Sequence, residues 1–131
     1  MAEVHNIEEI RANIEIWCEA LESGEYVQGG GYLERDDTFC CLGVACKALG
    51  IGAVKHEDGT VYYEESDTFA PLSLMRKLGL TNPRGEYSYI NESGVTEYTS
   101  LVDRNDAYGW NFKQIADLIR SRPSGLFIEG M

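Results

Sequence analysis

The chain has 131 residues, 44% of them hydrophobic, which is the usual size of one domain and enough to bury a core without disulfide bonds. Its 22 acidic and 11 basic residues give a net charge of -11, which opposes binding to the phosphates of a nucleic acid polymer. No stretch reaches the roughly 18 consecutive apolar residues of a membrane span, and Met1–His5 lacks the basic and apolar regions expected of a signal peptide. We therefore expect one domain over residues 1–131, cytoplasmic, with neither membranes nor nucleic acid polymers as partners.

The first helix is expected over Ile7–Leu21, where apolar residues recur at three- and four-residue spacing. Asn6 and Glu9 fit a capping box at its start, and Gly24 fits its end. Residues 25–38 follow, with three consecutive glycines and neither helical nor strand periodicity. We expect this segment to be a loop whose backbone is free to approach another group closely.

A second, very apolar helix is predicted over Phe39–Leu49, entered through Asp37 or Thr38 and ended by Gly50. Such a helix belongs in the core. Gly43 lowers its helix propensity, and we expect close approach of a neighbouring element there in return.

The middle of the chain predicts a β-hairpin, a helix and a second β-hairpin. Residues 53–56 and 60–64 flank an Asp-Gly turn, and a helix from Pro71 to Gly79 follows. Beyond a turn at residues 82–85, strands are expected over 86–90 and 95–101.

Asn111, with Gln114 three residues on, predicts a capping box for the last helix, which ends before Pro123. The apolar residues 126–128 either form an edge strand or cover a partner. The whole pattern indicates an α+β domain with about four helices and two β-hairpins.

The cysteines do not point to a metal site. They are four in number: Cys18, Cys40, Cys41 and Cys46. Free thiols are expected in a reducing compartment. Adjacent Cys40 and Cys41 point in different directions, and His5 and His56 lie far from them in the sequence, so we predict no metal and no cofactor. Cys40 is the candidate for a reactive thiol, because it lies at the start of the predicted helix and a helix N-terminus lowers a thiol pKa.

No catalytic residue is predicted either. His56 is the only internal histidine and sits at a hairpin tip, where a solvated turn residue is the simpler interpretation than a base beside a thiol. The glycine run matches neither common phosphate-binding motif.

Two segments do have the composition of a binding site. The glycine-rich loop contributes Tyr26, Gln28, Tyr32 and Arg35, although an ordinary solvated loop with packed tyrosines is an equal alternative. Residues 103–111 gather a cation, amides, carboxylates and two aromatic rings before the last helix, where the helix N-terminus favours an anion. The alternative there is a capped loop whose Trp110 is a hydrophobic staple.

Two motifs resemble those of a family of small phage-encoded accessory proteins. They are W-C-x-A-L-x-S-G-x-Y-x-Q-G at Trp17–Gly29 and C-C-L-G-V at Cys40–Val44. Asn105–Ile119 is similar to the family's C-terminal segment, whereas residues 52–98 carry none of its motifs. The resemblance implies a phage setting without an assigned enzymatic activity. Small phage proteins of this kind often counter host defence, some by sequestering nucleotide signals.

The leading hypothesis is therefore a non-catalytic phage sponge for a nucleotide-derived immune signal, either cyclic ADP-ribose-like or a cyclic dinucleotide. The expected ligand-binding residues are Tyr26, Tyr32 and Trp110 for stacking, Arg35 and Arg104 for phosphate, and Gln28, Asn105 and Asp106 for ribose or base edges. One rival is an acidic inhibitor that binds a host defence or DNA-binding protein. Another is an enzyme that degrades the signal, with Asp103 or Asp106 as base. A homo-oligomer is left open.

Overall fold

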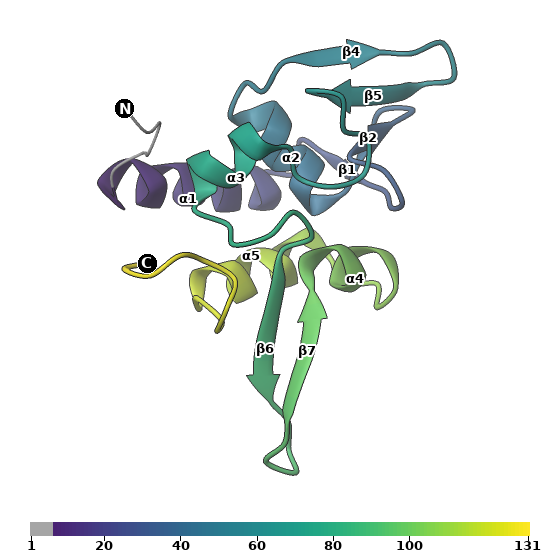
Figure 1. Cartoon of the computed structure of the whole chain (residues 1–131). Coiled ribbons are helices and arrows are strands. Elements are labelled where there is room, and N and C mark those ends of the chain that lie inside the picture. Colours follow the sequence, from purple (N-terminus) through teal and green to yellow (C-terminus); the bar gives the residue numbers. More distant parts are fainter. Residues whose placement is uncertain (1–6) are drawn as a thin grey trace.

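The computed structural model describes residues 7–131, with helix α1 (Ile7–Glu22) at the centre (Figure 1). The predicted apolar spacing places one face of this helix in the core: Ile10, Ile14, Trp17, Cys18 and Leu21. That face packs against α2 (Cys41–Ala48), α3 (Leu72–Leu78) and α5 (Phe112–Arg120). The expected capping box between Asn6 and Glu9 falls on Asn6, which lies outside the described residues.

The glycine-rich segment contains three short strands, so its prediction as a strand-free loop is wrong. They are β1 (Val27–Gln28), β2 (Glu34–Arg35) and β3 (Thr38–Phe39). With β4 (Ala53–Lys55) and β5 (Thr60–Tyr63) they form a sheet in the order β1-β3-β2-β5-β4. Asp36 and Asp37 join β2 to β3 with φ values of 53° and 64°, a left-handed pair that makes a tight hairpin turn.

Helix α2 begins at Cys41, two residues later than predicted, because Phe39 belongs to β3 and Cys40 is the N-cap. The Cys40 Sγ accepts a hydrogen bond from the Gly43 amide. The expected close approach at Gly43 is confirmed, since a Cβ there would lie 1.7 Å from the Leu33 carbonyl oxygen. The absence of a side chain at Gly43 thus lets the backbone of Leu33, the residue before β2, pack against the first turn of the helix.

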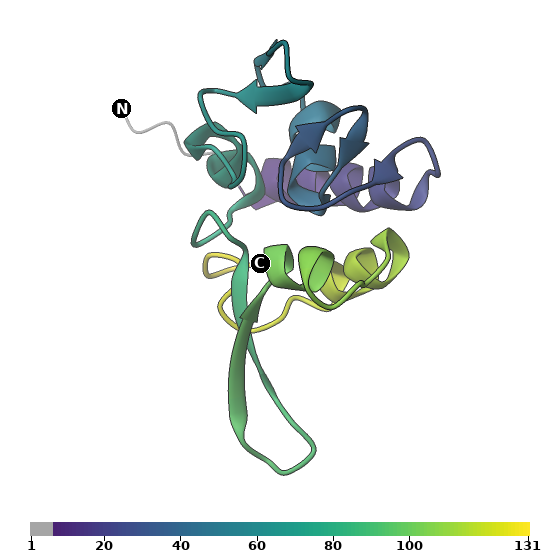
Figure 2. The same ribbon diagram turned by 90° about the vertical axis from the view of Figure 1, so that its right-hand side faces the viewer.

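The predicted elements of the middle and end of the chain are present. β4 and β5 form the first hairpin, and α3 ends at Gly79 in the left-handed conformation. β6 (Glu86–Ile90) and β7 (Thr96–Ser100) form the second, which projects from the body of the fold (Figures 1 and 2). The Asn111–Gln114 capping box at the start of α5 is confirmed.

Near the C-terminus, one element differs from the prediction, and one alternative that the sequence left open is resolved. Leu101–Asp106 forms a short helix, α4, capped by the Ser100 hydroxyl, where the sequence predicts the end of a strand and then a loop. The apolar tail packs on the protein itself, since Leu126 is fully buried and Phe127 pairs with Leu80 in an isolated bridge.

The structure is an α+β domain, as predicted. Within residues 7–131 it has five helices, of which the six-residue α4 is the one that the sequence does not indicate. No helix in this range is long and apolar enough to cross a membrane.

Candidate functional site

The two segments singled out in the sequence meet in space. The Gln28 side-chain amide donates hydrogen bonds to Asn105 Oδ1 at 2.8 Å and to the Trp110 carbonyl at 2.7 Å. β1 therefore lies against the end of α4 and the loop that follows it.

The remaining polar atoms of this contact are also used within the protein. The Asn105 amide nitrogen donates to the Gly29 carbonyl and to Asp106 Oδ1, both at 2.8 Å, and Asn105 is 7% exposed. Asp106 Oδ2 accepts from the Gly31 amide at 3.1 Å. Both donor hydrogens of the Gln28 and Asn105 amides are thereby satisfied. We call this contact between Gln28, Asn105 and Asp106 the loop junction.

Arg104 lies beside the loop junction but inside a cluster of rings. Its guanidinium carbon is 4.5 to 6.0 Å from four ring centroids, those of Tyr87, Tyr89, Tyr108 and Trp110. Its Nε donates to the Tyr87 hydroxyl at 2.7 Å. The rings come from β6 and from the loop between α4 and α5, so Arg104 holds these two elements together. Trp110 also lines a hollow of about 360 Å³ with residues of α5.

The other predicted residues lie on the sheet. Tyr26 is half-buried and packs edge-on against Phe39, with ring centroids 5.1 Å apart. Tyr32 lies under the Arg35 guanidinium, 4.8 Å from ring centroid to carbon. The Arg35 Nε is buried and has no hydrogen-bond partner within the described residues, the nearest carboxylate oxygen being that of Asp36 at 4.0 Å.

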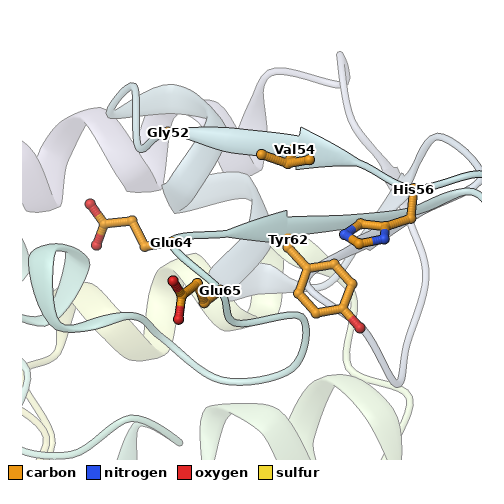
Figure 3. Close-up of a pocket in the computed structure, with 6 residues that line it drawn as sticks. All are labelled: Gly52, Val54, His56, Tyr62, Glu64 and Glu65. Carbon is orange, nitrogen blue, oxygen red and sulfur yellow. The ribbon is translucent and has the colours of Figure 1, made fainter.

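A hollow of about 610 Å³ lies on the β4–β5 hairpin (Figure 3). It is lined by Gly52, Val54, His56, Tyr62, Glu64 and Glu65. The His56 and Tyr62 rings are neighbours, with centroids 4.3 Å apart, and the two carboxylates lie to one side of them. We call this hollow the hairpin groove. Its size is within the range of about 300–1,000 Å³ typical of small-molecule sites.

The strand register places Arg35 on the same side of the sheet as the groove. Arg35 is the partner of Thr60, and Tyr62, two residues further along β5, is the partner of Val54. Paired residues, and residues two apart, share a face of a sheet. Arg35 therefore lies towards the hairpin-turn end of this face, whereas Glu64 and Glu65 lie at the opposite end of β5.

Electrostatic effects link the same groups. Asp67 raises the pKa of Tyr62, with smaller contributions from burial, Asp58 and Tyr32. Hydrogen bonds from Thr60 lower the pKa of Asp58, and the nearby charges of Arg35 and His56 lower it further. Arg35 thus lies on this face with the carboxylates of Asp36 and Asp58 near it, and Glu64 and Glu65 carry negative charge at the other end of β5.

Sequence reasoning identified Tyr32 and Arg35 but missed the groove itself. The sequence predicts His56 as a solvated turn residue, whereas the structure places its ring beside that of Tyr62 on the neighbouring strand. The signal was present, because Val54 and His56 alternate on one face of a predicted hairpin, where Val54 is opposite Tyr62 and His56 is opposite Thr60. The His56 and Tyr62 rings are diagonal neighbours on this face and reach each other without being a directly opposed pair.

The cysteines are packing residues in this structure. All four are free and buried. Burial raises the pKa of Cys18 and of Cys40 to about 11 and that of Cys41 and Cys46 further, so the lowered pKa expected for Cys40 is wrong. Within residues 7–131 no three His, Cys, Asp or Glu side chains are grouped to hold a metal ion.

Residues 9–123 match the family described as "Domain of unknown function (DUF8296)", and the chain belongs to that family. No curated protein and no solved structure matches the chain.

Proposed function

We propose that this protein is a non-catalytic binder of a small nucleotide-derived ligand, held on the hairpin groove. The observation that carries the proposal is the arrangement on one sheet face: a neighbouring His56 and Tyr62 ring pair with Arg35 towards one end and two carboxylates at the other. A base, a ribose and a phosphate are recognised by different protein groups, and this face offers aromatic rings, carboxylates and a guanidinium.

Each group has a role that its chemistry suits. The His56 and Tyr62 rings present flat surfaces for a base. Glu64 and Glu65 accept hydrogen bonds from ribose hydroxyls or from exocyclic amino groups. Arg35 donates to phosphate, and its buried Nε lacks a partner in the described part of the protein.

The net charge of -11 does not prevent binding of a small anion. A local cation sets the field within a pocket whatever the total charge is. The two carboxylates at the far end oppose a phosphate there, which orients the ligand with its phosphate towards Arg35.

The resemblance to small phage-encoded accessory proteins supplies the biological setting of the proposal. In that setting the protein acts in the host cytoplasm as a sponge, and its ligand is a cyclic ADP-ribose-like molecule or a cyclic dinucleotide made by a defence system. The ligand is released intact, because sequestration needs binding and no turnover.

The loop junction has a structural role in this proposal. Its amide hydrogens are already bonded within the protein, and a ligand would have to displace those bonds. Arg104 likewise faces rings of its own chain. The site is therefore centred on Arg35 and Tyr32, the two predicted residues next to the groove, together with the four ring and carboxylate side chains of the hairpin.

The test is native mass spectrometry with a panel of cyclic dinucleotides and ADP-ribose derivatives, followed by chromatography of the released molecules. We expect one intact ligand at fixed stoichiometry, and Tyr62→Ala and Arg35→Ala each to weaken its binding by about tenfold or more. Tyr98→Ala removes an exposed tyrosine elsewhere and is the matched control. Arg104→Ala should leave binding intact.

Three outcomes contradict the proposal. Release of a cleaved ligand identifies an enzyme instead. Loss of binding in Arg104→Ala but not in Tyr62→Ala places the ligand at the ring cluster. No retained ligand from any panel member removes the case for a nucleotide sponge.

A further inference from the structure

The β6–β7 hairpin extends away from the packed helices in Figures 1 and 2. Five residue pairs, from Glu86 with Ser100 to Ile90 with Thr96, make its ladder, and Asn91–Val95 close it with a turn. A two-stranded hairpin alone is marginally stable in water, so its root must be secured elsewhere.

The root is secured by contacts on both strands. Tyr87 is 3% exposed and accepts the hydrogen bond from Arg104, whose guanidinium also lies over Tyr89. The Ser88 amide donates to the Ser124 carbonyl at 2.8 Å, and the Leu101 amide donates to the Gly85 carbonyl at 2.9 Å. These bonds fix the direction of the hairpin relative to the body, so that it meets a partner already oriented.

The two faces of the hairpin differ. On the face with Tyr87 and Tyr89, the Tyr89 hydroxyl and the Asn91 amide both donate to the Glu97 carboxylate. The Thr99 hydroxyl on this face is buried and has no hydrogen-bond partner among the described residues. The opposite face carries Tyr98 and Ile90, which are 82% and 67% exposed. Large apolar side chains this exposed, on an oriented element, are typical of a binding surface.

The surroundings of Tyr98 suit a basic side chain. Hollows of about 190 and 350 Å³ adjoin this residue, and Glu86 lines both of them. The larger hollow is also lined by Arg84, which pairs with Asp103 at 3.0 Å. A lysine or arginine placed in the smaller hollow meets the carboxylate and the face or edge of the tyrosine ring together. The chain uses the cation–tyrosine part of this combination internally, where Arg104 lies against Tyr87 and Tyr89.

The charge of the hairpin selects among classes of partner. Residues 86–100 contain Glu86, Glu92 and Glu97 and no lysine or arginine. An acidic surface repels nucleic acid phosphates and anionic lipid head groups, and attracts a basic protein surface.

We propose that the face formed by Glu86, Ser88, Ile90, Thr96 and Tyr98 docks a basic segment of another protein, with Tyr98 and Ile90 as apolar anchors and Glu86 as the partner of a lysine or arginine. This surface is distinct from the hairpin groove, and the two bind independently. A protein carrying both recruits a partner through one and holds a small ligand in the other.

The experiment is a titration of the full-length, isotope-labelled protein with a lysine- and leucine-rich peptide, followed by NMR amide shifts and by calorimetry. Because the whole protein is acidic, location and variants decide the result. We expect the largest shifts at Tyr98, Ile90 and Glu86, and weaker binding as salt is raised. Tyr98→Ala should lower the affinity by about tenfold.

Glu86→Gln and Glu92→Gln form the matched pair, since each removes one exposed carboxylate of the hairpin and only the first lies on the docking face. Glu86→Gln should weaken binding and Glu92→Gln should leave it nearly unchanged. Equal effects of the two variants, shifts centred on the groove or on α1, or unchanged affinity in Tyr98→Ala would each overturn the proposal. So would a concentration-dependent dimer that buries Tyr98, which assigns the face to a second copy of this chain.

Discussion

The loop junction and the hairpin groove have similar residue types but opposite uses of them. At the junction, the side-chain amides of Gln28 and Asn105 donate all their hydrogens to other groups of the chain. In the groove, the Glu64 carboxylate accepts one hydrogen bond, from the Ser73 hydroxyl at 2.9 Å, the Glu65 carboxylate is exposed, and Arg35 keeps a buried donor without a partner in residues 7–131. Composition alone therefore does not separate a structural contact from a binding surface, because what matters is whether the chain itself satisfies the polar groups.

Among the buried contacts of the protein, the one at Gly43 should be the most costly to disrupt. A Cβ at this position would overlap the Leu33 carbonyl, and backbone cannot move aside as a flexible side chain can. Gly43→Ala should lower the free energy of unfolding by about 3 kcal/mol or more, measured by urea denaturation. Gly52→Ala is the control, since its Cβ would meet nothing within 4 Å and its cost should be far smaller.

The junction itself should respond next most strongly. Asn105→Ala leaves the Gly29 carbonyl and one Gln28 hydrogen without partners, at a cost of about 2 kcal/mol in unfolding free energy. Gln28→Ala should not add its full effect to that of Asn105→Ala, since both remove one shared bond. Tyr62→Ala in the groove should change stability by only about 0.5 kcal/mol, and an effect as large as that of Asn105→Ala would erase the distinction between the two regions.

The smallest effect is expected at the exposed ion pairs between α1 and α5. Hydrogen bonds from Arg120 and Lys113 lower the pKa of Glu22 to about 2. Since the folded pKa lies below the unfolded value, Glu22 stabilises the fold above about pH 4.5 and loses this contribution as the pH falls towards 2. The stability difference between wild type and Glu22→Gln should therefore shrink as the pH is lowered.

Glu19→Gln removes the same charge from α1 and serves as the comparison. A constant difference between wild type and Glu22→Gln from pH 7 to pH 2 would show that the ion pairs do not stabilise the fold. Screening by solvent keeps the effect small at any pH.

The sequence predicted the long elements well and the short ones poorly. A helix such as α5 repeats its apolar spacing over several turns, and its capping box adds an independent signal at Asn111. β1, β2 and β3 have two residues each, too few for an alternation to appear, and their pairing depends on contacts made elsewhere in the fold. Helix α4 was hidden because its six residues directly continue β7.

The same contrast holds for the candidate site: the sequence predicts some of its residues but not the contacts that bring them together. Tyr32 and Arg35 could be found from composition, since an aromatic ring beside a guanidinium is visible in the sequence. That Arg35 shares a face with Tyr62 depends on the pairing of β2 with β5, which no local pattern encodes. The hydrogen bond between Gln28 and Asn105 joins residues 77 positions apart, and no local pattern predicts it either.

The packing of α1 against α5 also sets the order in which the chain can fold during synthesis. The two helices that close the core come from opposite ends of the sequence, Ile7–Glu22 and Phe112–Arg120. While the ribosome is still making the middle of the chain, the apolar face of α1 has only α2 and α3 to cover it. Native packing is therefore completed only once α5 has emerged from the ribosome, and until then part of the apolar face of α1 is exposed in the nascent chain.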